Sequence, residues 1–176
     1  MDYFFTEQQQ MIIDTAREIT NEKIIPVRAE LDEKNQFPRE ILQDIAKADL
    51  FSIFVPEEYG GLGGGCYEIV LALEELARGC VGVATSFAAS ALGIFPVLFA
   101  GSEEQKQHYL PDIASGARWA AFGLTEANAG SDASGIRTTA VLDGDEWVLN
   151  GTKQWITNGG EADIYLAPQE MRAVLH

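Results

Sequence analysis

Cysteine and histidine are scarce in this chain of 176 residues, which contains two of each. Cys66 and Cys80 form no CxxC pair, and we expect them to be reduced packing residues rather than a disulfide. His108 and His176 are too few to form a histidine metal cluster or a convincing Ser-His-Asp set. The sequence therefore predicts no metal site.

Basic residues are few as well, with 12 lysines and arginines against 27 acidic residues and a formal net charge of -15. Such a charge repels nucleic-acid phosphates and anionic lipid, so we expect neither nucleic acid nor a membrane as a partner. An anionic cofactor would need local backbone donors instead of an overall attractive field. No secretory n-region opens the sequence, which favours a cytoplasmic protein.

One stretch, residues 79–102, lacks charged side chains and is long enough to raise the question of a membrane span. It contains Gly82, Gly93 and Pro96, and the adjoining sequence is acidic, without the basic anchors typical of membrane helices. We therefore expect a helix buried in an all-helical domain. A composition of 47% hydrophobic and 22% charged residues is that of an ordinary globular core.

Apolar residues recur at helical spacing through the first two thirds of the chain. Two capping-box patterns and a first-turn proline mark helix starts, at Thr6 with Gln9, at Ser102 with Gln105, and at Pro38. Pro111 is expected to end the helix that follows Ser102, because the residue before a proline disfavours helical backbone angles. The segment 56–65 is expected to be a loop, since glycine fills five of its last six positions.

The periodicity changes near residue 116. Residues 120–125 form a short apolar run, and residues 137–142 and 146–150 predict a β-hairpin. Asn150-Gly151 predicts a tight turn before a further strand at 154–157. The sequence thus predicts an α+β protein: an N-terminal all-α helical domain, residues 1–116, followed by the beginning of an antiparallel β-barrel-like domain, residues 117–176.

Seven motifs in order resemble those of the acyl-CoA dehydrogenase family, over nearly the whole chain. They lie at residues 31–38, 55–63, 74–78, 101–106, 109–111, 124–132 and 150–158. The resemblance implies FAD-dependent α,β-dehydrogenation of an acyl-CoA thioester, in fatty acid metabolism, with electrons passed to an electron-transfer flavoprotein.

The resemblance also implies that two separated segments bind FAD. The residues concerned are Phe122, Leu124, Thr125, Gly130, Ser131, Trp155, Ile156 and Thr157. Thr125 would bond the polar edge of the flavin ring, Ser131 would meet the pyrophosphate and the CoA moiety, and Trp155 would pack against the ring system. Taken alone, these residues also fit an ordinary strand, a surface turn and a core tryptophan.

For the acyl chain, the resemblance points to Ala84, Ala88 and Leu92 on the uncharged helix. Their small size would leave room for more than the shortest acyl groups, although small residues on a buried helix also allow close helix packing. No residue of this chain is assigned as the catalytic base. Glu126 belongs to one of the motifs, and we expect it to hold the loop.

The family takes its base from a C-terminal helical domain that would follow His176. We therefore expect an N-terminal portion that is inactive alone and part of a homo-oligomer when full length. Residues 168–176 depart from the family's strand pattern, which suggests a truncation, a frame change or a partial gene model. Two alternatives remain: a non-enzymatic helical module that pairs with itself or a related subunit through an open sheet edge, and a flavin oxidase or monooxygenase of the same superfamily.

Overall fold

A computed structural model describes residues 4–168 and 170–171 of the chain. Six α-helices come first, namely α1 (Glu7–Ile19), α2 (Arg28–Glu33), α3 (Arg39–Lys47), α4 (Cys66–Gly79), α5 (Val81–Ala100) and α6 (Glu103–Ala114). Short π- or 3-10-helical segments lie at Thr20–Ile24, Leu50–Phe54, Glu57–Tyr59 and Ala133–Gly135. The strands are β1 (Ala120–Phe122), β2 (Thr139–Asp143), β3 (Glu146–Asn150), β4 (Ile164–Leu166) and β5 (Glu170–Met171).

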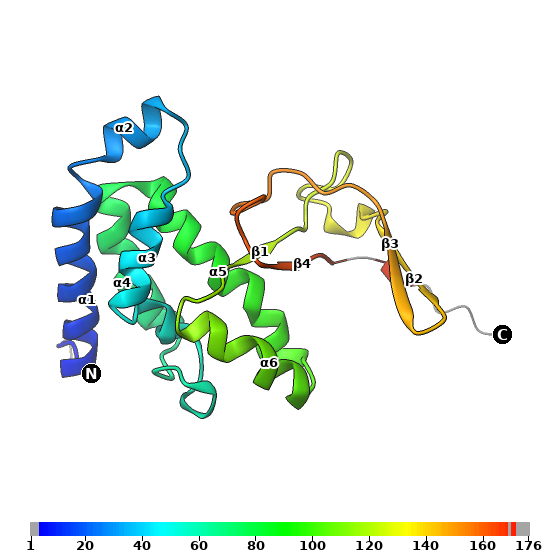
Figure 1. The fold of residues 1–176 in the computed structure, drawn as a ribbon, viewed down its shortest axis with the longest axis horizontal. Coiled ribbons are helices and arrows are strands. Elements are labelled where there is room, and N and C mark those ends of the chain that lie inside the picture. Colours follow the sequence, from blue (N-terminus) through cyan, green and yellow to red (C-terminus); the bar gives the residue numbers. More distant parts are fainter. Residues whose placement is uncertain (1–3, 169, 172–176) are drawn as a thin grey trace.

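This order confirms the predicted α+β class, with a helix-rich part followed by a small β region (Figure 1). The described strands form a two-stranded and a three-stranded sheet and no closed barrel. The predicted domain division at residue 116 falls in the connection between α6 and β1 and stays a prediction. The predicted departure from a strand pattern at 168–176 falls mainly outside the described residues.

Local sequence signals explain where several helices begin and end. Thr6 and Ser102 cap α1 and α6 through reciprocal bonds with Gln9 and Gln105, as predicted. Pro38 directly precedes α3 rather than occupying its first turn. The prediction that Pro111 ends α6 was wrong, since the helix continues to Ala114 and the Pro111 carbonyl accepts a bond from the Ser115 N–H at 3.0 Å.

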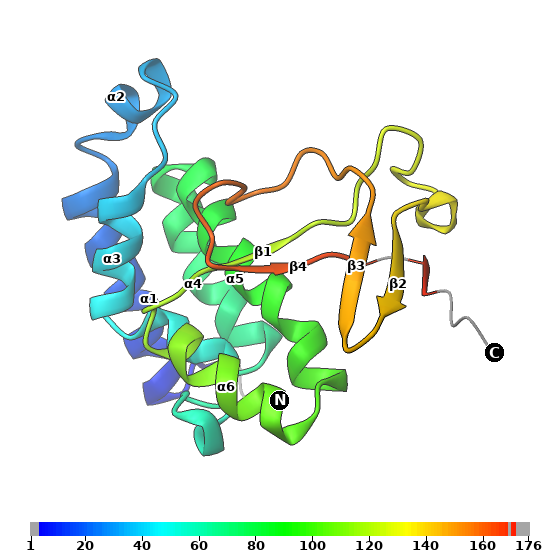
Figure 2. The same ribbon diagram turned by 45° about the vertical axis from the view of Figure 1, so that its right-hand side comes forward.

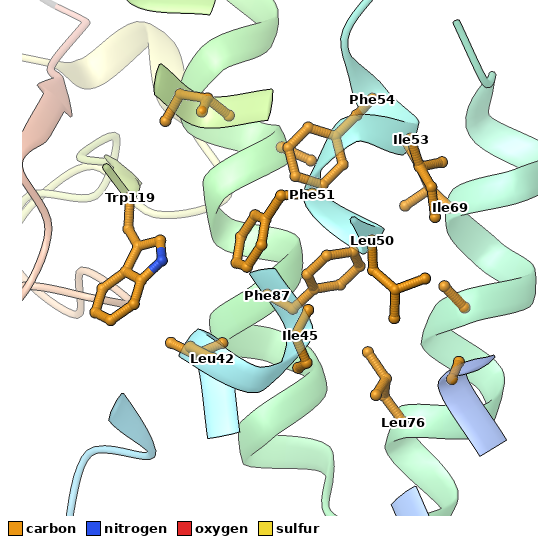
Figure 3. Packing of buried hydrophobic residues seen from close by; sticks show 14 of the residues in the cluster. Leu42, Ile45, Leu50, Phe51, Ile53, Phe54, Ile69, Leu76, Phe87 and Trp119 are labelled. Atoms are coloured by element: carbon orange, nitrogen blue, oxygen red, sulfur yellow. The ribbon is translucent and has the colours of Figure 1, made fainter. Parts of the chain in front are cut away.

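Helix α5 is the uncharged stretch, and it lies inside the protein against α4, α6 and β1. Its length and composition alone would suit a membrane span, and half of its most apolar window is buried within the fold. Phe87 of α5 meets Phe51 and Phe54 of the 3-10 segment Leu50–Phe54, at ring-centroid distances of 5.1 and 5.5 Å (Figure 3). These three rings are almost completely buried, so the predicted role of α5 as a core helix agrees with its packing.

The strand pairing differs from the predicted antiparallel meander. The β2–β3 hairpin is antiparallel as predicted, but β1 pairs with β4 in parallel and β2 pairs with β5 in parallel. The expected strand at 154–157 is absent, because Trp155 and Asn158 have φ angles of 59° and 63°, which extended strands exclude. Strands β1 and β4 lie across α5, whereas the β2–β3 hairpin lies to one side of the helices (Figures 1 and 2).

Gly93 allows α5 to approach β1 closely. A Cβ atom at this position would lie 2.8 Å from Ala120 Cβ and 3.0 Å from the Ala121 backbone nitrogen. We expect Gly93→Ala to lower the free energy of unfolding by about 1–3 kcal/mol, because the added methyl group would force the backbone of β1 at Ala120 and Ala121 to shift.

Gly82→Ala, in the same helix, is the matched control for this substitution. Its Cβ would meet only Cys80 Sγ, at 3.7 Å, so the higher helix propensity of alanine should leave stability unchanged or raise it by up to about 1 kcal/mol. Urea denaturation of both variants measures the difference. Equal effects would contradict the proposed close contact between α5 and β1.

Candidate functional site

A groove of about 510 Å³ lies between α5 and two segments of the β region, and we refer to it as the groove. It brings together eight of the eleven sequence-predicted site residues: Phe122, Leu124, Thr125, Trp155, Ile156, Thr157, Ala88 and Leu92. Residues from three distant parts of the sequence therefore share one cleft.

Three predicted site residues do not line the groove. Ala84 is buried in the core, and Gly130 and Ser131 lie on an exposed loop outside the groove. A Cβ atom on Gly130 would meet no other atom within 4 Å, so no neighbouring group in the described chain requires glycine there. The predicted contact of this loop with a pyrophosphate stays a prediction.

Thr85 and Ala89 line the groove, and the sequence reasoning missed both. They share one helix face with Ala88 and Leu92, since positions 85, 88, 89 and 92 follow the i, i+3, i+4, i+7 spacing. That spacing could have identified Thr85 and Ala89, whereas it also admits Ala84, which lies four residues before Ala88. The Thr85 hydroxyl already donates to the Val81 carbonyl at 2.8 Å. The helix wall of the groove therefore consists of mostly small side chains and offers few free polar groups.

The opposite wall of the groove offers hydrogen-bond donors. The backbone N–H groups of Leu124, Thr125 and residues 155–157 make no hydrogen bond to another described residue. Backbone N–H groups beside a cleft that have no partner in the described chain can donate to the polar edge of a ligand.

Trp155 has an unusual conformation at the mouth of this wall. Its φ angle is 59° and its side chain is 86% exposed. A bulky residue rarely adopts a left-handed backbone conformation, and such strain is concentrated at functional sites. An exposed indole held at this cost is well placed to pack against a planar ligand in the groove.

An ion pair joins the two segments that form this wall. Lys153 Nζ lies 2.8 Å from Glu126 Oε1 and 3.1 Å from the Leu124 carbonyl oxygen, and both side chains are nearly buried. The Glu126 carboxylate also accepts the N–H groups of Arg137 at 2.8 Å and Thr138 at 3.0 Å. These contacts agree with the predicted loop-holding role of Glu126.

The same contacts set the charge state of Glu126. Its bond with the Lys153 ammonium, followed by those from the Thr138 hydroxyl and the Arg137 N–H, lowers the pKa of Glu126 from its ordinary 4.5 to about 2. At neutral pH the group is an ionised and very weak base.

Clusters of three or more metal-ligating side chains do not occur in the described part of the chain.

Asn158 fixes the next turn of this wall against the helices. Its side-chain amide donates to the Ser86 carbonyl of α5 at 2.9 Å and to the Ala120 carbonyl of β1 at 3.2 Å. Only 5% of Asn158 is exposed. Asn158 therefore positions its neighbour Thr157, which lines the groove.

Comparison with known proteins places this geometry in context. Residues 6–117 match the family model of the acyl-CoA dehydrogenase N-terminal domain, and residues 121–170 match that of the middle domain. The chain is 41% identical to a probable acyl-CoA dehydrogenase of Bacillus subtilis, covering 92% of this chain and 43% of that protein. It is 40% identical to a short-chain specific acyl-CoA dehydrogenase of Clostridium acetobutylicum, covering 94% and 44%.

Solved structures also match the chain over most of its length. A structure described as the electron transferring flavoprotein of Acidaminococcus fermentans matches with a TM-score of 0.91 and 43% identity, covering 95% of this chain and 44% of that one. An acyl-CoA dehydrogenase from Bacillus anthracis, complexed with FAD, matches with a TM-score of 0.88 and 37% identity, covering 95% and 29%. The chain thus spans less than half the length of these relatives.

The Glu126–Lys153 pair predicts a defined dependence of stability on pH. Because the pKa of Glu126 is lowered on folding, its stabilising contribution is complete above pH 4.5 and is lost as pH falls towards 2. Glu126→Gln should be less stable than the wild type at pH 7, and the difference should shrink between pH 4.5 and 2. Urea denaturation at several pH values measures it.

Lys153→Met serves as the second arm of that experiment. Removing the ammonium takes away the largest cause of the lowered pKa, so the acid-induced loss should still begin near pH 4.5 but should be smaller and should end at a higher pH than in the wild type. If the wild type and Glu126→Gln lose stability in parallel on acidification, the pair does not have the proposed effect.

Asn158→Ala should lower the free energy of unfolding by about 2–3 kcal/mol, since two buried carbonyl groups lose a donor. Asn35→Ala is the matched control, because Asn35 also has a positive φ, 48°, but an exposed side chain. Thermal unfolding of both variants separates the buried bonds from the backbone strain. A loss of equal size in the control would mean that the bonds to Ser86 and Ala120 contribute little.

Proposed function

This chain belongs to the acyl-CoA dehydrogenase family, and we propose that it forms the helical and flavin-facing part of an enzyme that dehydrogenates an acyl-CoA thioester between its α and β carbons. The carrying observation is the groove, which brings together backbone N–H groups without a partner in the described chain, the exposed and strained Trp155, and mostly small side chains of α5. Family membership supports FAD as the cofactor, and one solved relative is described as complexed with FAD.

The groove residues fit such a cofactor. The N–H groups of Leu124 and Thr125 and the hydroxyls of Thr125 and Thr157 would bond the polar atoms of the flavin ring, while Trp155 would pack against the ring system. When bound, FAD supplies the acceptor for the hydride that leaves the β carbon. Local backbone donors of this kind bind polar ligand atoms without an overall attractive charge, which the net charge of -15 does not provide.

The α5 wall would take the acyl chain. Thr85, Ala88, Ala89 and Leu92 are uncharged and mostly small, which suits an aliphatic chain and leaves room for more than the shortest acyl groups. Ala84 is withdrawn from this role because it lies in the core rather than in the groove.

Proton abstraction from the α carbon would need another residue. Glu126 is the carboxylate on the groove segments, but its pKa of about 2 and its bonds to Lys153, Arg137 and Thr138 make it unsuitable as a base. We propose that the base comes from a part of the enzyme that the longer relatives contain, and that these 176 residues alone do not catalyse turnover.

Partners and location follow from the same proposal. An electron-transfer flavoprotein would accept the electrons, which is supported by the neighbouring structure described as an electron transferring flavoprotein. We also propose that the full-length enzyme is a homo-oligomer, lies in the cytoplasm and takes part in fatty acid metabolism.

A second candidate is a non-enzymatic module that pairs with itself or a related subunit. One observation favours it: Trp147, Val148 and Leu149 of β3 are exposed on a hairpin that lies away from the helices. An exposed apolar strand of this kind pairs readily with another chain. Such a module would have no need for backbone donors along the groove, so cofactor binding distinguishes the two candidates.

Flavin titration tests the proposed function. Trp155→Ala should weaken FAD binding about tenfold, because the aromatic contact with the ring system is lost. Trp147→Ala is the matched control, since this tryptophan is also exposed but lies on the hairpin outside the groove. Quenching of flavin fluorescence measures both affinities.

Three results would contradict the proposal. The first is a wild-type protein that binds no FAD, and the second is an equal effect of the two tryptophan substitutions. The third is turnover of an acyl-CoA by the 176 residues with an artificial electron acceptor, which would refute the location of the base. Rapid reaction of the reduced flavin with oxygen would indicate an oxidase or monooxygenase instead.

A further inference from the structure

The turn of residues 158–163 connects the groove to the helical part of the protein. It begins next to Thr157, which lines the groove, and ends at β4. Asn158 accepts the N–H groups of Glu161 at 3.0 Å and Ala162 at 2.9 Å through its backbone carbonyl, so the turn is internally bonded. Any contact that holds Glu161 is therefore transmitted to the groove wall through a short, bonded segment.

Arg39, the first residue of α3, makes such a contact. Its guanidinium group donates to the Glu161 carboxylate, across 122 positions of sequence. The same guanidinium lies 5.1 Å from the centroid of the Trp119 ring and 6.0 Å from that of Phe37. Arg39 thus combines an ion pair with two cation–π contacts.

Trp119 joins this arrangement to the far end of the turn. Its backbone N–H donates to Asp163 Oδ2 at 3.0 Å, and its carbonyl accepts the N–H groups of Asp163 at 2.9 Å and Ile164 at 3.1 Å. The Trp119 side chain is buried, beside the aromatic core in Figure 3. Arg39 consequently touches both Glu161 within the turn and the residue that anchors its end.

We propose that Arg39 is a positioning residue for the groove: by holding Glu161 and Trp119 together, it fixes the turn 158–163 and, through it, Thr157. This inference rests on the proposed function, because it concerns the affinity of the groove for FAD. Arg39 and Glu161 are partly exposed, with side-chain exposures of 52% and 35%, so their contacts set the position of the turn more than the stability of the fold.

Hydrogen exchange and flavin titration of the same variants test the proposal. Arg39→Gln should speed exchange of the Asp163 and Ile164 amides about fivefold and weaken FAD binding about fivefold, with little change in melting temperature. Arg39→Lys keeps the positive charge but not the planar guanidinium group, so it should restore both properties in part.

Arg17→Gln is the matched control for these measurements. Arg17 also forms a partly exposed ion pair between two elements, with Glu75 at 2.7 Å, but it bridges α1 and α4 away from the groove. This variant should change neither the exchange of Asp163 and Ile164 nor the affinity for FAD.

The outcomes separate the inference from the function on which it rests. Unchanged exchange in Arg39→Gln would overturn the inference, and so would faster exchange with wild-type FAD affinity. If the wild type itself binds no FAD, the proposed function fails and the positioning role falls with it. The exchange data would then still show whether Arg39 holds the turn.

Discussion

The groove depends on the ion pair between Lys153 and Glu126. This pair gathers three segments: the segment after β1 at Leu124, the residue before β2, Thr138, and the segment that leads to Trp155. Two opposite charges with little solvent exposure are costly to desolvate unless further hydrogen bonds complete them. Here the Leu124 carbonyl and backbone N–H groups supply those bonds, so removing either partner would leave a charged group inside the wall.

The second constraint is the close approach between α5 and the β region. Glycine at position 93 lets the helix contact β1, and the Ser90 hydroxyl accepts the Ala120 N–H at 3.3 Å. The side-chain amide of Asn158 donates to the Ser86 carbonyl of α5 and to the Ala120 carbonyl of β1, and so joins the two elements. One helix therefore serves as core and as groove wall, with its bulky ring of Phe87 turned to the aromatic cluster and its small residues to the cleft.

Much of this could be predicted from local sequence patterns. Capping boxes, the buried uncharged helix and the β2–β3 hairpin depend on residues close together in sequence, and all are present in the structure. The parallel β1–β4 pair was missed because β4 has only three residues, which are too few to show the alternation that indicates a strand. The strand predicted at 154–157 failed because Trp155 has a left-handed backbone conformation, which no local pattern of the sequence indicates for a bulky residue. The Arg39–Glu161 contact joins positions too distant for any local pattern to relate them.

The electrostatics of Glu126 divide the proposed chemistry between two parts of an enzyme. A general base works best with a pKa near the working pH, whereas a structural carboxylate is most stabilising when its pKa is lowest. The contacts that make Glu126 hold the groove together, which lower its pKa to about 2, are the same contacts that disqualify it from removing a proton. Under the proposed function, a groove assembled in this way would orient a flavin ring and an acyl chain, and proton abstraction would come from a residue in a different environment. The chain spans less than half the length of its relatives, and under the proposed function the base belongs to the further sequence that those relatives contain.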